Sequence, residues 1–92
     1  MENFDIDFYK KSHKDFANYS NNELVIHWIK VGKTHSKLPN KKVFYDKFPD
    51  FSWKVYKSLN PDLEKKGYNT EELLINHYWE IGQYEKRKYM ID

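Results

Sequence analysis

An internal repeat is the feature of this sequence that most constrains its fold, because repeated copies are expected to form the same local structure. Four residues recur at a constant spacing of 47 positions, with Phe4, Tyr9, Lys10 and Asp15 returning as Phe51, Tyr56, Lys57 and Asp62. Three more recur at a spacing of 50, with Leu24, His27 and Gly32 returning as Leu74, His77 and Gly82. The extra residues fall between Asp62 and Thr70, where a loop can absorb them. We therefore predict two diverged copies of one module, residues 4–37 and 51–87, joined by residues 38–50 in a single domain, 1–92.

Each copy is predicted to close on an amphipathic helix. In the first copy, Ser20 and Glu23 have the spacing of a capping box, and Gly32 is predicted to end the helix with a positive φ. Thr70 and Gly82 take these two roles in the second copy. At about 100° per residue the apolar positions fall on one face. These positions are Leu24, Val25, Trp28, Ile29 and Val31 in the first copy, and Leu74, Ile75, Tyr78, Trp79 and Ile81 in the second.

Shorter helices are predicted upstream in each copy. Asp5 and Ser52 are candidate N-caps. The buried positions are predicted to be Phe8 and Tyr9 in the first copy, and Val55, Tyr56 and Leu59 in the second. A third helical piece follows Asn60, which we expect to cap it, and ends at Gly67; its counterpart at residues 13–16 lacks the cap and the proline and should be looser. Sustained alternation of apolar and polar residues is absent, so the fold class is all-α.

Composition limits the core and the chemistry. A chain of 92 residues buries only about 60% of its unfolded surface, and 18% of its residues are aromatic, so rings should dominate the core. Residues 38–50 carry aromatic anchors and should pack as a compact connector. The absence of cysteine excludes disulfides, thiolate nucleophiles and Cys-based zinc sites. With a net charge of +2, no basic leader and no apolar span, we expect a cytoplasmic or virion-interior protein without membrane contact.

The second copy resembles a known repeat. The string that begins at Phe51 and continues through Asn60-Pro61-Asp62-Leu63, His77-Tyr78 and Gly82 to Glu85 and Arg87 resembles a short repeat of giant-virus proteins of the mimivirus type. Such repeats are often appended to glycosyltransferase-like domains. In the first copy His35 and Lys37 replace Glu85 and Arg87. The resemblance implies an accessory module of glycan-modifying machinery.

The recurring polar residues are the candidate site residues. His27 and His77 lie at the border of the apolar face, where an imidazole can pack and hydrogen-bond; a metal or acid–base role is the alternative, although the His-Glu-x-x-His spacing of zinc hydrolases is absent. Asp15 and Asp62 start short helices, where a carboxylate suits the helix dipole. A sharper hypothesis pairs Asp62 with Arg87 or His77.

Aromatic and basic residues suggest two further ligand classes. Trp28, Trp53, Trp79 and Tyr78 are expected in the core, and weak sugar stacking is the alternative. The Lys41–Lys57 stretch suggests nucleic acid, but its acidic residues weaken that interpretation. No nucleophile elbow or phosphate loop occurs, so we expect no cofactor and no catalysis. The sequence favours a non-enzymatic binding or scaffolding module with a protein partner or a homo-oligomeric state. A small histidine-dependent metal protein or enzyme, using His27 or His77 with Asp15 or Asp62, is the alternative, and a weak nucleic-acid binder is the third.

Overall fold

The computed structural model describes residues 4–90, and these residues form helices without any strand. The predicted all-α class is confirmed. The elements are α1 (Ile6–Lys11), the 3₁₀ turn η1 (Lys14–Phe16), α2 (Asn21–His27), the π turn η2 (Trp28–Gly32), α3 (Lys41–Lys47), α4 (Trp53–Leu59), α5 (Pro61–Lys65), α6 (Glu71–His77) and the π turn η3 (Tyr78–Gly82). We call residues 4–37 the N-terminal segment and residues 51–87 the C-terminal segment.

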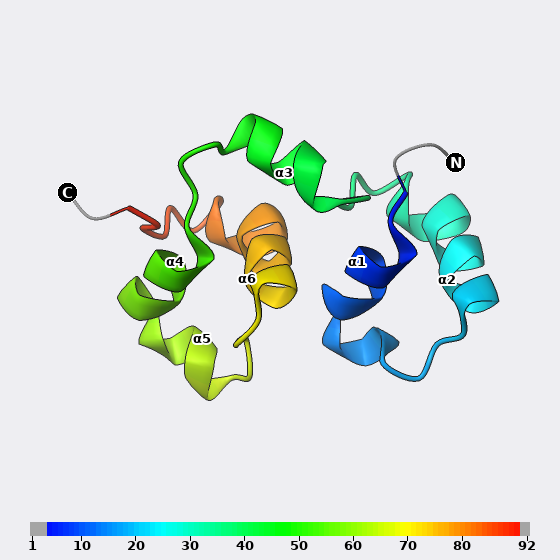
Figure 1. Ribbon diagram of the computed structural model, residues 1–92, viewed down its shortest axis with the longest axis horizontal. Coiled ribbons are helices and arrows are strands. Elements are labelled where there is room, and N and C mark those ends of the chain that lie inside the picture. The colour runs from blue at the N-terminus through cyan, green and yellow to red at the C-terminus, as the bar shows by residue number, and fades with distance from the viewer. Residues whose placement is uncertain (1–3, 91–92) are drawn as a thin grey trace.

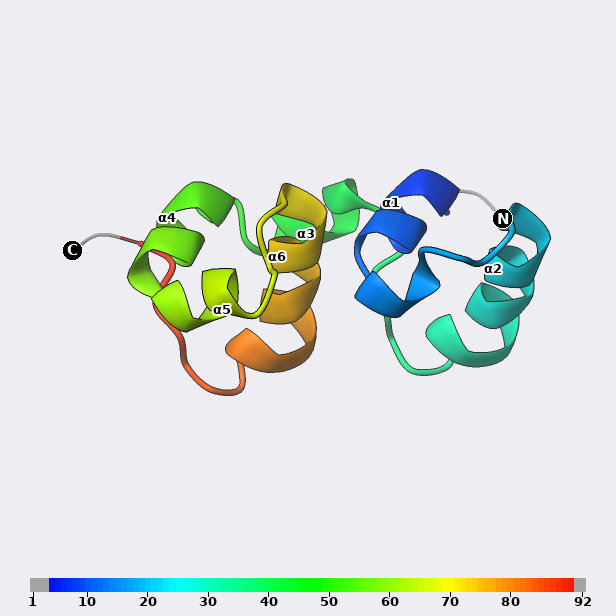
Figure 2. The same ribbon diagram turned by 90° about the horizontal axis from the view of Figure 1, so that it is seen from below.

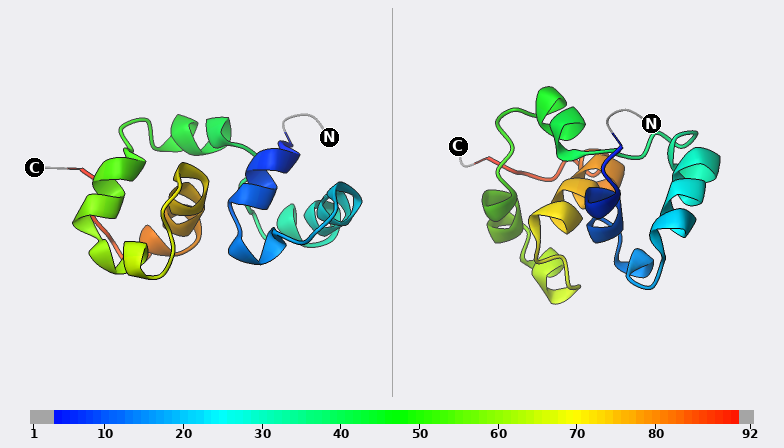
Figure 3. Two further views of the ribbon diagram at one scale, coloured as in Figure 1. Left: turned by 60° about the horizontal axis from the view of Figure 1, so that its bottom comes forward. Right: turned by 45° about the vertical axis from the view of Figure 1, so that its right-hand side comes forward.

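The helices lie side by side along the long axis of the molecule, in the order α4, α6, α1, α2 (Figure 1). The molecule measures 42 × 27 × 19 Å. Helix α3 crosses above the junction between the two segments, and a view turned by 90° has the same order of helices (Figure 2). Two further views agree that α6 is the neighbour of α1 (Figure 3). Helix α6 of the C-terminal segment therefore contacts α1, the first helix of the N-terminal segment.

The predicted helix starts are confirmed. The Asp5 carboxylate accepts from the backbone N–H of Phe8 at 3.0 Å, and Ser52 accepts from that of Val55 at 3.4 Å. Ser20 and Glu23 form the complete capping box, with distances of 3.2 and 3.0 Å. Thr70 caps α6 through the N–H of residue 73 at 3.3 Å. These caps satisfy N–H groups that have no partner within the helix.

Gly32 and Gly82 end their helical elements, as predicted, but the expected positive φ is wrong. Each glycine is the last residue of a π turn, and the left-handed residues come four positions later, at Ser36 and Lys86, both with φ of 57°. In the first π turn the N–H of Lys33 donates to the carbonyl of Trp28 at 2.7 Å, one residue more than an α-helical turn. The third glycine, Gly67, has φ of 91° and follows α5 as predicted.

Aromatic rings dominate the core, as predicted. The N-terminal cluster contains the buried residues Tyr9, Phe16 and Leu24, with Phe4, Ile6, Tyr19 and Trp28 packed against it. The larger cluster is built on Phe8, Leu38, Phe44, Phe51, Tyr56, Leu63, Leu74, Ile75 and Tyr78. Phe8 thus leaves its own segment and joins the core of the other one. Its neighbour in sequence, Tyr9, fills the N-terminal cluster, so α1 buries side chains on both sides.

Three residues that we predicted to be buried are exposed. Ile29 is 53% exposed, Ile81 44% and Leu59 40%. The first two lie within the π turns, where the longer turn breaks the 100° spacing on which the predicted face depends. Leu59 lies on α4, at the open end of the row of helices. The outer side of that helix has no neighbouring helix among the described residues to cover it.

The connector packs against the core, as predicted, but part of it forms a helix that we did not predict. Asn40 caps α3 by accepting from the N–H of Val43 at 2.9 Å. Phe44 is fully buried in the larger cluster. Glu71 at the start of α6 accepts from Lys41 at 2.7 Å and from the hydroxyl of Tyr45 at 2.8 Å. Apolar and charged contacts together fix α3 onto α6.

Candidate functional site

Each of the two candidate histidines is hydrogen-bonded to a tyrosine of its own segment. Nδ1 of His27 lies 2.7 Å from the hydroxyl oxygen of Tyr9. Nδ1 of His77 lies 2.8 Å from that of Tyr56. Each tyrosine comes from the first helix of its segment and each histidine from the last turn of the next long helix. The pairing was not predicted, although the recurrence of a tyrosine and a histidine in both copies was a signal for it.

Burial keeps both partners neutral. It raises the pKa of Tyr9 and of Tyr56 well above the ordinary tyrosine value. It also lowers the pKa of His27 and His77, and nearby Lys37 and Arg87, respectively, push in the same direction. A neutral imidazole retains one acceptor nitrogen, which suits a hydroxyl donor. Each pair is therefore a polar link within a packed core.

A glycine completes each arrangement. A β-carbon on Gly32 would lie 2.5 Å from the hydroxyl oxygen of Tyr9, and one on Gly82 would collide with the hydroxyl of Tyr56. Real Cβ atoms do not approach so closely. These glycines are therefore needed for the close approach of a tyrosine rather than for a left-handed backbone. This requirement explains why a glycine stands inside each π turn.

Asp62 and Arg87 form the ion pair that the sequence suggested. Nη1 and Nη2 of Arg87 each lie 3.0 Å from an oxygen of Asp62, a bidentate geometry. Arg87 also donates to Glu85 at 2.7 Å and to Oδ1 of Asn60 at 3.1 Å. The hydrogen bonds from Arg87 lower the pKa of Asp62. The segment after α6 is thereby fixed to the junction of α4 and α5.

Asn60 stands at the N-cap position of α5, as predicted, but its side chain makes no cap bond to that helix. Its amide nitrogen donates instead to the backbone carbonyls of Tyr56 at 2.8 Å and Lys88 at 2.9 Å. Asn60 therefore ties the C-terminal stretch to α4, and Pro61 begins α5 without a side-chain cap.

Asp15 takes a different place from Asp62. It lies exposed in the three-residue 3₁₀ turn η1, where the C-terminal segment has the five-residue helix α5. Lys37 stands in the place of Arg87 but has a different partner. Its ammonium donates instead to Glu80 of the C-terminal segment at 2.7 Å. Arg87 thus fixes the C-terminal segment internally, whereas Lys37, its counterpart, joins the N-terminal segment to the C-terminal one.

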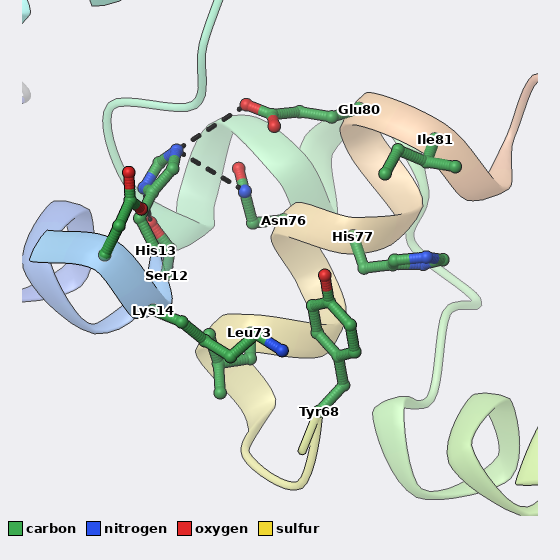
Figure 4. A pocket seen from close by; sticks show the side chains of 10 residues that line it. Ser12, His13, Lys14, Tyr68, Leu73, Asn76, His77, Glu80 and Ile81 are labelled. Atoms are coloured by element: carbon green, nitrogen blue, oxygen red, sulfur yellow. Dashed lines mark hydrogen bonds and ion pairs between the residues drawn. The ribbon is translucent and has the colours of Figure 1, made fainter. Parts of the chain in front are cut away.

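A cleft of about 340 Å³ lies at the junction of the segments, between α1–η1 and α6 (Figure 4). Nε2 of His13 lies 3.6 Å from Glu80 and 3.5 Å from the amide nitrogen of Asn76. Burial raises the pKa of Glu80, but the bonds to His13 and Lys37 outweigh it and hold this pKa at about 2. Asn76 is 6% exposed, and its Oδ1 has no hydrogen-bond partner. Lys14 closes one side by lying 4.0 Å above the Tyr68 ring.

The tryptophans and Tyr78 pack in or against the core, as predicted. Trp28 stacks on Phe4, with ring centroids 4.9 Å apart. Trp53 and Trp79 pack against the larger cluster, in which Tyr78 is buried. The indole nitrogen of Trp79 donates to the carbonyl of Ser36 at 2.8 Å, a further polar link between the segments.

Within residues 4–90, no group of three or more His, Cys, Asp or Glu side chains is arranged to hold a metal ion. No helix among these residues has both the length and the apolar character to cross a membrane. Comparisons of the chain with protein-family models, with curated proteins and with solved structures gave no match.

Proposed function

We propose that this chain is a non-enzymatic scaffolding module made of two diverged copies of one helical unit, acting through contacts with proteins. The observation that carries the proposal is the use of both recurring histidines inside the fold. Each is engaged at Nδ1 by a buried tyrosine and is held neutral by burial. Because Nδ1 of each histidine is occupied by a contact within the core, a structural role is favoured over chemistry at the surface.

The backbone around the π turns supports the duplication. The N–H of Lys37 donates to the carbonyl of Gly32 at 2.9 Å, and that of Arg87 to Gly82 at 3.0 Å. Each bond joins residues five positions apart and closes a turn that contains a left-handed residue, Ser36 in one segment and Lys86 in the other. Together with the two tyrosine–histidine pairs, they favour one ancestral unit over chance similarity. A unit of about 35 residues is too small to bury its apolar face alone, so stacking on a neighbour suits it.

The resemblance to giant-virus repeats gives this scaffold a context. We propose that it accompanies glycan-modifying machinery, in host cytoplasm or virion interior, through protein contacts or weak sugar binding. Weak carbohydrate binding is the lesser role, because Phe4 already covers one face of Trp28, and the Lys47 ammonium lies 5.3 Å from the ring centre of Trp79.

Metal titration with histidine variants tests the proposal. We expect calorimetry with Zn²⁺ to give no stoichiometric binding. His77→Ala should lower the free energy of unfolding by about 2–3 kcal/mol because it removes a buried, hydrogen-bonded ring. His27→Ala should act in the same direction by less, since His27 is less buried. The matched control is His35→Ala, because His35 is exposed.

The opposite result would favour the metal-dependent alternative. It would consist of one tightly held zinc ion in the wild type, lost in a histidine variant that remains folded. Nucleic-acid binding is tested separately, because phosphate contacts make retention on a polyanion column depend steeply on salt. We expect early elution with little dependence on salt.

A further inference from the structure

The junction between the two segments is a head-to-tail contact. The outer side of α6 and η3 faces α1 and the end of the N-terminal segment. Phe8 enters the cluster that contains Ile75. Trp79 donates to the carbonyl of Ser36, and Glu80 binds Lys37. The two surfaces in contact are different, so the same contact can be repeated at either end of the molecule.

Helix α2 has the position in its segment that α6 has in the other, and it lies at one end of the row (Figure 1). Helix α2 and the turn η2 that continues it expose two large apolar side chains. Ile26 and Ile29, each 53% exposed, stand where the C-terminal segment has Asn76 and Trp79. A shallow groove of about 330 Å³ beside them is lined by Tyr19, Glu23, Ile26, His27, Lys30 and Val31.

Helix α4 lies at the opposite end and is the counterpart of α1. Val55 stands in the place of Phe8, and Leu59, 40% exposed, in the place of Ser12. The outer side of α4 is thus apolar at the positions through which α1 receives α6. Each end of the molecule carries one half of the contact found at its centre.

We propose that the outer side of α2 binds the outer side of α4 of a second copy of this chain, repeating the internal junction between molecules. This inference rests on the proposed two-copy architecture, because it transfers the contact of one unit to the other. Leu59 of the second copy would enter the groove beside Ile26. Since the surfaces differ, such an assembly grows by addition at its ends.

The charges at the two ends fit this arrangement. At the internal junction an acid, Glu80, meets the basic side chains of His13 and Lys37. The counterpart of Glu80 is Lys30 of η2, so the charge is reversed. At the α4 end, Arg87 is paired with two carboxylates, Asp62 and Glu85. These two side chains are 47% and 49% exposed, whereas that of Arg87 is 20% exposed, so they are the carboxylates offered to Lys30, among the exposed lysines Lys54 and Lys86.

Sedimentation velocity of the full chain over a wide concentration range tests the proposal. We expect the mass of the wild type to rise with concentration and to pass that of a dimer. Ile29→Glu and Leu59→Glu should each lower the association constant at least about tenfold, because each places a charge at the centre of the contact. Val43→Glu is the matched control, since Val43 is 38% exposed on α3, away from both ends.

Mixing the two variants gives the sharpest readout. Ile29→Glu keeps an intact α4 side and Leu59→Glu keeps an intact α2 side, so an equimolar mixture should form a dimer that cannot grow. A self-pairing of α2 predicts the reverse, with Leu59→Glu dimeric alone and no gain on mixing. Circular dichroism checks that both variants are folded. If one is not, Ile26→Lys or Leu59→Ser replaces it at the same surface.

Two outcomes would overturn the proposal: a wild type that stays monomeric up to millimolar concentration, or a mixture that contains only monomers. Neither outcome would touch the proposed function as tested by zinc titration and histidine variants, because those measurements report on contacts within one molecule. Conversely, zinc retention would remove the scaffold proposal whatever the mass of the particle.

Discussion

The hydroxyl of Tyr56 lies 2.8 Å from Nδ1 of His77. Tyr56 is fully buried and His77 is 6% exposed, so neither group can turn to water for a replacement partner. The related pair of Tyr9 and His27 has the same geometry in a less buried setting. A buried donor that loses its acceptor, or the reverse, costs more free energy than an exposed one. Removing the tyrosine hydroxyl therefore breaks the same hydrogen bond at two sites that differ in the burial of the histidine.

Removing one hydroxyl should destabilise the fold in proportion to this burial. We expect Tyr56→Phe to lower the free energy of unfolding by about 1–2 kcal/mol, because Nδ1 of His77 is left unpaired. Tyr9→Phe should lower it by less. Urea denaturation followed by circular dichroism measures both. Tyr84→Phe is the control, since Tyr84 is 76% exposed; equal losses in all three variants would contradict the role assigned to the pairs.

The close approach of glycine and tyrosine predicts a coupled pair of mutations. Gly82→Ala should cost about 1–3 kcal/mol by overpacking, since its new methyl group meets the hydroxyl of Tyr56. The double variant with Tyr56→Phe lacks this hydroxyl. Its loss of unfolding free energy should therefore be smaller than the sum of the losses in the two single variants. Strict additivity in denaturation experiments would show that the two residues do not interact. Gly67→Ala is the contrast, because its penalty comes from a φ of 91° and not from crowding.

Local signals in the sequence predicted local structure well. The capping box of Ser20 and Glu23 was evident because both partners lie within one helical turn. The pairing of Asp62 with Arg87 was also predicted, from recurrence of the acid and a basic residue at the end of the second copy. The helical fold class followed from the same periodicities.

The predictions failed where the structure depends on contacts between residues that are distant in sequence. A positive φ was expected at Gly32 because nothing near it in sequence signals the hydroxyl of Tyr9. The exposure of Ile29 depends on a π turn, which no short pattern signals. Lys37 binds Glu80, 43 positions away and in the other segment, a contact that the repeat does not signal. The capping Asn40 and the spacing of Phe44 and Phe48 were available signals for α3 that were not used.

The Asp62–Arg87 pair should contribute measurably, unlike an ordinary surface ion pair. A double-mutant cycle with Asp62→Asn and Arg87→Gln should give a coupling free energy clearly different from zero that shrinks with added salt. The matched control is Lys42 with Asp46, a pair whose side chains are 83% and 65% exposed, for which we expect coupling near zero. A cycle that gives the same small value for both pairs would remove the role of Arg87 in fixing the C-terminal stretch.

The buried histidines predict how stability depends on pH. Burial lowers the pKa of His27 and His77 from 6.5 in the folded protein, so below that value the unfolded chain takes up protons that the folded chain refuses. The stabilisation is complete above pH 6.5 and is lost as the pH falls. Carboxylates act in a lower window, since the pKa of Glu80 moves from 4.5 to about 2.

We therefore expect the free energy of unfolding to fall between about pH 7 and pH 5, above the range in which most carboxylates become protonated. Urea titrations at several pH values measure this slope. His77→Gln should flatten it, because glutamine does not titrate and can still meet the hydroxyl of Tyr56. The exposed His35 provides the control, and His35→Gln should keep the full slope. If the wild type is equally stable across this interval, or if both variants have the same slope, the histidines are not held neutral by burial.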